Sequence, residues 1–329
     1  MKNNWIWGLL LILILQSCGD GKVEKVNESP AESVAAKAVP KFNADSAFQY
    51  IKKQVDFGPR VPNTEEHKKA GAWLQQKMAS FGLEVSAQEF IAEAYDGKKL
   101  ELNNIIASYR PEAKKRILLA AHWDTRRVAD KDTERINEPI DGANDGGSGV
   151  GVLLEIARVI STDSLKPEVG IDFIFFDGED DGKPESSKGG TDDAKWWCLG
   201  SQYWAKNPHE RGYSAYYGIL LDMVGAKGAR FYKEGVSLQY AKGILDKVWS
   251  NAHQIGHSDF FQMRGSHAIT DDHIPVNEVA RIPMIDIIDY SPDFGFGRYH
   301  HKHSDNMDVI DKRTLKAVGE TVLFTLYQE

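Results

Sequence analysis

The stretch Gly170–Phe176 constrains the fold more than any other part of the sequence. Its residues, Gly-Ile-Asp-Phe-Ile-Phe-Phe, form an apolar, β-prone run that is typical of a strand buried on both faces. The run leads directly into the acidic segment 177–181, Asp-Gly-Glu-Asp-Asp. Ligands in open α/β sheets bind at such strand ends. Crowded carboxylates there persist if a cation neutralises them or if one keeps its proton, although an isolated acidic run is usually a solvated turn.

The rest of the chain alternates strand patterns with helix patterns, which predicts an α/β fold. We expect a mostly parallel central sheet with helices on both faces, in a single domain over residues 41–329. The predicted strands are Leu83–Phe90, Leu102–Tyr109, Arg116–Ala121, Gly170–Phe176, Tyr217–Leu221 and Ile282–Ile288. The predicted helices are Asp45–Val55, Thr64–Phe81, Val150–Ile160, Trp196–Asn207, Val236–Gln254 and a last helix that begins near Asp311. Asn43 and Asn63 are the expected N-terminal caps of the first two.

The composition excludes some classes of protein. The 329 residues carry a net charge of -8, which argues against nonspecific nucleic-acid binding. No internal repeat of solenoid or propeller length is present. Nothing in the pattern indicates a large apolar interface, so a monomer is expected.

The N-terminus has the pattern of an export signal. Lys2 precedes the apolar run Ile6–Leu15, which is too short to span a bilayer, and Gln-Ser-Cys18 follows. This ending resembles the lipobox of bacterial lipoproteins, which implies a signal peptide at 1–18 and a lipid on Cys18. A signal peptide with an incidental cysteine, or a short buried helix, is the alternative. Residues 19–40 are polar and rich in Ala, Ser, Lys and Glu, as in a flexible linker. The expected location is the bacterial cell envelope, on the periplasmic side or at the outer membrane, with a lipid anchor holding the protein to the membrane.

Cysteine usage limits the kind of metal site. With Cys18 lipidated, Cys198 is the only other cysteine, so no internal disulfide can form. Cys198 lies in the sequence Trp-Trp-Cys-Leu, where a small buried apolar role is expected. Any metal site must therefore use histidines and carboxylates.

Residues able to bind a metal or transfer a proton follow several predicted strands. Each has an ordinary explanation: a histidine can be buried and satisfied, and an aspartate can cap a helix. The carboxyl ends of parallel strands meet at one sheet edge, however, so together these residues indicate a catalytic zinc site built from His and carboxylate ligands. The residues are His122, Asp145, Glu179, Asp180, Asp222 and His303.

The motifs around these residues resemble, in order, those of the zinc aminopeptidase and glutaminyl cyclase superfamily, peptidase family M28. The matching segments are His122-Trp123-Asp124, 142–145 (Gly-Ala-Asn-Asp), 175–180 (Phe-Phe-Asp-Gly-Glu-Asp), 221–225 (Leu-Asp-Met-Val-Gly) and His303-Ser304.

Two activities of this superfamily imply different metal sites. The aminopeptidases hold two zincs: Asp145 would bridge them, Asp180 and His303 would complete one site, and His122 and Asp222 the other. The glutaminyl cyclases keep one zinc, on Asp145, Asp180 and His303, and use the other pair for hydrogen bonds or substrate contact. All five positions are present here, so the set of ligands does not distinguish one zinc from two.

Two further motifs favour the cyclase. The segment 271–275, Asp-Asp-His-Ile-Pro, resembles a cyclase motif whose second aspartate, here Asp272, binds the substrate amide. Trp196 and Trp197 resemble the aromatic wall of a cyclase pocket, although tryptophans also serve as ordinary core.

The sequence departs from the animal cyclases at two positions. Asp180 stands where they have a glutamate, which shortens the ligand and keeps its charge. Asp286 stands inside a buried strand where they have a histidine, and its partner is left open.

The resemblance therefore implies a glutaminyl-peptide cyclotransferase that acts on peptides or proteins with an N-terminal glutamine. One Zn²⁺ would polarise the γ-carbonyl, Glu179 would act as general base and acid, and Asp222 and Asp272 would assist as catalytic residues. The alternative is a di-zinc aminopeptidase. A metal-free binding protein is a third possibility, which the intact ligand set disfavours.

Overall fold

The computed structural model of the chain describes residues 36–184 and 194–329. The predicted signal segment 1–18, including Cys18, and most of the predicted linker 19–40 lie outside the described residues. Residues 37–329 form one compact unit. No helix within the described ranges has both the length and the apolar character needed to cross a membrane.

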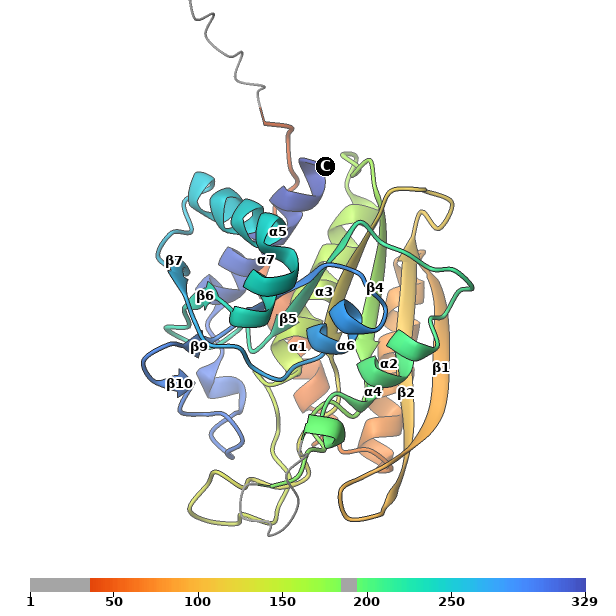
Figure 1. Cartoon of the computed structure of the whole chain (residues 1–329), viewed down its shortest axis with the longest axis vertical. Helices are drawn as coiled ribbons and strands as arrows, with labels where there is room; N and C mark the ends of the chain where they lie inside the picture. The colour runs from red at the N-terminus through yellow and green to blue at the C-terminus, as the bar shows by residue number, and fades with distance from the viewer. Residues whose placement is uncertain (1–35, 185–193) are drawn as a thin grey trace, which may run out of the picture. The chain divides into compact units, whose positions relative to one another are not determined.

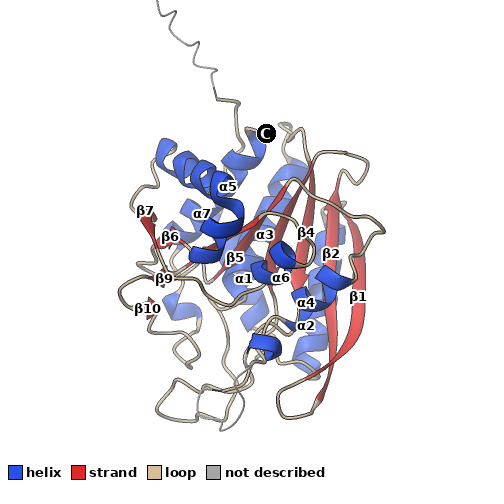
Figure 2. Cartoon of the chain, viewed as in Figure 1, coloured by secondary structure: helices blue, strands red, loops and turns tan. Residues whose placement is uncertain are grey.

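A six-stranded sheet runs through this unit (Figures 1 and 2). Four neighbouring strands are parallel to one another, and two antiparallel strands complete one edge. The predicted mostly parallel sheet is thereby confirmed. In spatial order the strands are β1 (Glu84–Glu93), β2 (Lys99–Tyr109), β4 (Gly170–Phe176), β3 (Arg116–His122), β5 (Tyr217–Asp222) and β8 (Met284–Ile288).

Helices cover both faces of the sheet, as predicted (Figure 2). Side chains such as Leu119 and Phe173 point to one face and belong to the larger apolar core, whereas Ala120 and Ile174 point to the other. The larger core includes residues of α1 (Ala44–Val55), α2 (Glu65–Ser80), α3 (Gly147–Thr162), α5 (Gly235–Gln254) and α7 (Lys312–Tyr327). The smaller core includes residues of α4 (Leu199–Lys206) and α6 (His273–Glu278).

Most predicted elements are present, and the differences have local causes. Strand β4 has the predicted bounds, and the Asn43 side chain caps α1 as expected. Helix α2 is capped by Thr64, whose Oγ1 accepts the His67 amide hydrogen, and not by the predicted Asn63. Asn63 has a positive φ of 74° and instead uses its side chain to bond the backbone of β2.

Several short elements were not predicted, because segments of two to six residues carry too little periodicity. They are η1 (Ala194–Trp196), β6 (Phe231–Lys233), β7 (Phe261–Gly265), α6, β9 (Tyr290–Ser291), β10 (Gly295–Phe296) and η2 (Met307–Val309).

The parallel register brings the functional strand ends together. His122 at the end of β3 lies beside Phe176 at the end of β4, and Asp222 at the end of β5 lies beside Ile288 of β8. The loops that follow these strands therefore start at one edge of the sheet, where ligands bind in this class of fold.

Candidate metal centre and active site

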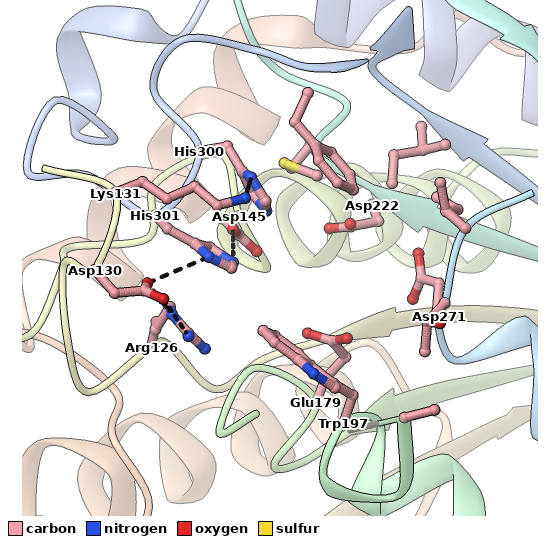
Figure 3. Close-up of a pocket in the computed structure, with 16 residues that line it drawn as sticks. Arg126, Asp130, Lys131, Asp145, Glu179, Trp197, Asp222, Asp271, His300 and His301 are labelled. Atoms are coloured by element: carbon pink, nitrogen blue, oxygen red, sulfur yellow. Dashed lines mark hydrogen bonds and ion pairs between the residues drawn. The ribbon is translucent and has the colours of Figure 1, made fainter. Parts of the chain in front are cut away.

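A cavity of about 380 Å³ lies at this edge of the sheet, and four of the predicted site residues line it: Asp145, Glu179, Trp197 and Asp222 (Figure 3). Acidic side chains face it from several loops, and basic and aromatic side chains complete its wall. The lining residues used below are Arg126, Asp145, Glu179, Trp197, Asp222, Asp271, His300 and His301.

Asp145, Asp180 and His301 form one possible metal site. His301 Nε2 lies 3.2 Å from Asp180 Oδ1 and 4.0 Å from Asp145 Oδ2. All three residues are buried, and the second oxygen of each carboxylate has no hydrogen-bond partner among the described residues. Asp145 and His301 line the cavity, and Asp180 contacts His301. Two carboxylates and one imidazole are the donor set of a catalytic zinc site with an open position, so these residues fit the metal. Zn²⁺ bound there would have two aspartates and one histidine as protein ligands.

The structure does not bring the predicted ligand His303 to this site. The His303 backbone N–H and Nδ1 both lie close to Asp132 Oδ2, at 2.9 and 3.0 Å, on the outer side of the loop. His301 has a positive φ of 56° in a turn closed by the bond from Lys302 N–H to Tyr299 carbonyl oxygen, and it points inward. We therefore replace His303 by His301 in the candidate ligand set.

His122 lies on the opposite side of Asp145, in contact with a second carboxylate. Its Nε2 is 3.1 Å from Asp145 Oδ1 and 3.2 Å from Asp222 Oδ1. Burial acts to lower the pKa of His122, but hydrogen bonds with Asp124, Asp145 and Asp222 raise it well above its usual value. Burial raises the pKa of Asp222 to about 7. His122 and Asp222 are thus paired with each other, and with Asp145 they could also surround a second cation.

Two aspartates that were not predicted hold the ligand loops from behind. Asp124 accepts the backbone N–H groups of Glu179 and Asp180, each at 3.1 Å. Asp305 accepts the amides of Asn144 and Asp145, at 2.8 and 3.0 Å. Asp124 belongs to a motif recognised in the sequence, but only the tertiary structure shows which amides it binds.

Glu179 is placed to transfer a proton. It lines the cavity next to the candidate metal ligand Asp180, and enclosure away from bulk water raises the pKa of its carboxyl well above the usual range. Cys198 donates its thiol hydrogen to Glu179 Oε1 at 3.3 Å, and its backbone N–H bonds the Glu179 carbonyl at 3.0 Å. The cysteine is buried as predicted, but its contact with the candidate base was not foreseen.

Trp197 and Trp196 have different surroundings. Trp197 lines the cavity between the Arg126 guanidinium, 4.8 Å from its ring centroid, and the His301 ring, stacked at 5.8 Å. Trp196 is not among the lining residues and lies against Lys195. Only Trp197 is therefore in position to contact a substrate in this cavity.

Asp271 and Asp272 lie on the wall beyond Glu179. Asp271 lines the cavity, whereas Asp272 is fully buried behind it and accepts the Ser201 hydroxyl at 2.6 Å. Burial and the neighbouring Asp271 raise the pKa of Asp272 well above its usual value. The predicted substrate contact of Asp272 thus requires a group that reaches past Asp271.

The outer acids of the segment 177–181 have structural partners. The Asp177 carboxylate is hydrogen-bonded to His67 Nε2 at 2.8 Å and accepts a hydrogen bond from the Asn103 backbone N–H at 2.6 Å. These contacts anchor the end of β4. Asp181, which could have been solvated surface, is 2% exposed and pairs with Arg127 Nε at 2.9 Å.

Comparison with known proteins gives consistent results. The model of Peptidase family M28 matches residues 104–326. A glutaminyl-peptide cyclotransferase of Drosophila melanogaster is 25% identical over 316 residues, covering 89% of this chain and 83% of that protein. The crystal structure of Bacteroides thetaiotaomicron glutaminyl cyclase bound to N-acetylhistamine has a TM-score of 0.86 at 53% identity, covering 89% of this chain and all of that one. A Zn-dependent exopeptidase from Parabacteroides distasonis gives the same TM-score, identity and 89% coverage.

Proposed function

The chain belongs to peptidase family M28, and we propose that it is a zinc-dependent glutaminyl cyclase. It is an enzyme that converts the N-terminal glutamine of peptides or proteins into pyroglutamate and releases ammonia. Its similarity to a bacterial glutaminyl cyclase, over nearly nine-tenths of the chain, supports this assignment.

The position of Asp271 and Asp272 carries the proposal. Asp271 lines the cavity that Glu179 and Trp197 also line, and Asp272 follows it in the same loop, buried behind the wall (Figure 3). A carboxylate accepts N–H bonds, and a glutaminyl side chain ends in an amide N–H₂ group. The cavity therefore combines an amide acceptor, an aromatic wall and a proton-transfer group within the reach of one small side chain.

The reaction proposed is an intramolecular aminolysis. The α-amine of the N-terminal glutamine attacks its own γ-carboxamide carbon, a ring C–N bond forms, and ammonia leaves. Bound Zn²⁺ supplies polarisation of the γ-carbonyl and stabilisation of the oxyanion. Glu179 accepts a proton from the attacking amine and returns it to the departing nitrogen.

The other residues position these groups. Asp124 fixes the backbone of Glu179, and the Cys198 thiol donates to its carboxylate. Trp197 packs against the methylene groups of the substrate, and Asp222 holds His122. Because the substrate supplies its own nucleophile, one zinc, on Asp145, Asp180 and His301, is sufficient.

Incubation with a glutamine-initiated dipeptide tests this function. We expect ammonia release and a pyroglutamyl dipeptide whose peptide bond is intact, detected by mass spectrometry. Release of free glutamine without cyclisation would show that the protein is a peptidase.

The second candidate function is a di-zinc aminopeptidase. The observation that favours it is the spacing of His122, Asp145 and Asp222, whose ligand atoms all lie within 4.8 Å of one another. In that case Glu179 would activate a water molecule between two metals. Hydrolysis of dipeptides that begin with leucine or alanine would support this alternative.

We also propose that the protein is a monomer anchored to the bacterial cell envelope through a lipid on Cys18. The anchor is proposed from the sequence of the N-terminus, and the monomer because the sequence gives no indication of a large apolar interface. A Cys18→Ser variant should move from the membrane fraction to the soluble fraction, whereas recovery in the membrane fraction would refute the anchor.

A further inference from the structure

A second depression, here named the α4–α6 groove, opens beside the active-site cavity. It has a volume of about 280 Å³ and is lined by residues along α4 and by residues of α6. Trp197 and Asp271 line both the groove and the cavity, so the two spaces meet at these side chains. Asp145 and His301 of the candidate metal site line only the cavity. A substrate that reacts beside Asp145 and His301 can therefore extend past Trp197 into the groove.

The two walls of the groove come from short helices that pack against each other (Figure 1). On one wall, Cys198, Gln202 and Lys206 follow one another at intervals of four residues, so they share one face of α4. The other wall belongs to α6 and the residue that follows it, and it consists of Ile274, Pro275, Glu278 and Val279. The groove thus runs along α4, from the cavity toward the C-terminal end of this helix.

The wall formed by α4 is long enough for several residues of a peptide. Cys198 and Lys206 lie at its two ends, and the helix between them rises by about 12 Å. An extended peptide rises by about 3.3 Å per residue, so this wall spans about three to four residues. When an N-terminal glutamine lies beside Trp197, the fourth residue of the peptide therefore comes close to Lys206.

The wall formed by α6 is mostly apolar and open to solvent. Val279 is 46% exposed, and Ile274 beside it is partly exposed. An apolar side chain of a bound peptide would remove this surface from water, which is favourable. Glu278, the acid on this wall, accepts the Tyr240 hydroxyl of α5 at 2.9 Å.

The wall formed by α4 is basic. Lys206 is exposed at the last position of the helix, and Lys195, two residues before Trp197, also lines the groove. Among the ion pairs of the described residues, none includes Lys195 or Lys206. A lysine in the last turn also stabilises its own helix through the dipole, so its position alone does not indicate a ligand. These two lysines, however, lie in a groove continuous with the active site, where they would attract an acidic side chain.

We propose that the α4–α6 groove binds the residues that follow the N-terminal glutamine of the substrate, and that Lys206 selects an acidic side chain near the fourth position. The inference rests on the proposed cyclase function and adds a substrate class to it. This class consists of peptides or proteins that begin with glutamine, continue with apolar residues and carry an acid about three residues later. Lys206 thereby determines specificity without touching the reacting atoms.

Three tetrapeptide amides test the proposal. They are Gln-Leu-Ala-Glu, Gln-Leu-Ala-Gln and Gln-Leu-Ala-Lys, each amidated at the C-terminus so that only the charge of the fourth side chain differs. Ammonia release at low ionic strength gives kcat/KM for each. We expect the wild type to favour the Glu peptide over the Lys peptide by about three- to tenfold, with the Gln peptide between them, because exposed ion pairs have modest energies. At about 1 M salt, where the Debye length is about 3 Å, this preference should largely disappear.

Lys206→Glu should reverse the order, so that the Lys peptide becomes the better substrate. The ratio of the two peptides is taken within one preparation, so a loss of folded protein affects both rates equally and cancels. Lys69→Glu is the matched control, since Lys69 is exposed on α2, does not line the groove, and changes the net charge by the same amount. This control should keep the order of the wild type.

Two results would overturn the groove as the binding site of the downstream residues. One is a ratio near one in the wild type, or an order that Lys206→Glu does not change. The other is a shift of equal size in Lys69→Glu, which would attribute the preference to the net charge of the protein. Turnover of the glutamine-initiated dipeptide, measured in parallel, separates these results from a failure of the proposed function, because absence of cyclisation with every peptide would refute the cyclase itself.

Discussion

The two sides of the active-site cavity contain similar acids in very different surroundings. On one side, Asp145 and Asp180 are close to the imidazoles of His122 and His301 and to Arg126. On the other side, Asp271 and Asp286 lie close to the single imidazole of His273. The number of cationic partners therefore differs more than the number of carboxylates.

The pKa values follow this difference. Burial acts to raise the pKa of Asp145, but the hydrogen bond with His122 brings it below the usual value. The pKa of Asp286 is raised well above the usual value by burial and by Asp271. Burial penalises every one of these carboxylates, and contact with His122 more than offsets it for Asp145. Asp180 is an exception on the first side, because burial and Asp145 raise its pKa although His301 and Arg126 lie beside it.

The largest effect is expected from removing the ligand histidine. His301→Ala should lose the zinc of the Asp145 site and reduce kcat/KM by about a thousandfold or more, because several kcal/mol of charge stabilisation depend on that metal. Zinc content and turnover of a glutamine-initiated dipeptide are the measurements. His303→Ala is the matched control and should stay close to wild type, since His303 binds Asp132 away from the cavity. The reverse pattern would restore His303 as the ligand.

Glu179→Gln should separate metal binding from proton transfer. The amide keeps the shape of the side chain but cannot accept the proton, so kcat should fall by about 10²–10⁴-fold. Zinc content should not change, because Asp180 and not Glu179 contacts His301. Retention of near-wild-type turnover would show that another group is the base.

Glu234→Gln tests the charge of the carboxylate that is hydrogen-bonded to His273. The folded-state pKa of Glu234 is about 2, below the ordinary value, so its charged form stabilises the fold above about pH 4.3. Near pH 6 the free energy of unfolding of the wild type should be about 3 kcal/mol higher than that of the variant. This difference should disappear as the pH falls from about 4.5 to 2. Urea unfolding in the presence of chelator measures it without a contribution from bound metal. A gap that does not change with pH would mean that Glu234 is not ionised.

Asp272→Asn should have the smallest effect of the four. An amide can still accept the Ser201 hydroxyl, but its contact with a substrate N–H₂ group is weaker, so kcat/KM should fall by about 10- to 100-fold. The measurement is the pH dependence of kcat/KM, in which the variant should lose one ionisation. A profile identical to that of wild type would remove Asp272 from the reaction and leave Asp271 as the amide acceptor.

Much of the fold could be predicted because local patterns match the final structure. The apolar run Gly170–Phe176 has the same bounds as β4, and Asn43 caps α1 as its position suggested. At the start of α2 two capping residues were available, Asn63 and Thr64, and a contact with β2 decided between them. That choice depends on a strand about 36 residues away, which local patterns do not contain.

The sequence predicted the types of side chain in the candidate site better than it predicted which individual residues form it. The sequence alone identified the acids and histidines at the strand ends, because parallel strands must place their carboxyl ends together. Only the tertiary structure decided which of the three histidines of the segment 299–303 reach the cavity: His300 and His301 line it, whereas His303 binds Asp132. The partners of Asp286, an acid in a predicted buried strand, could not be found from the sequence either. Its neighbours Asp271 and His273 come close to it only because α6 packs against β8.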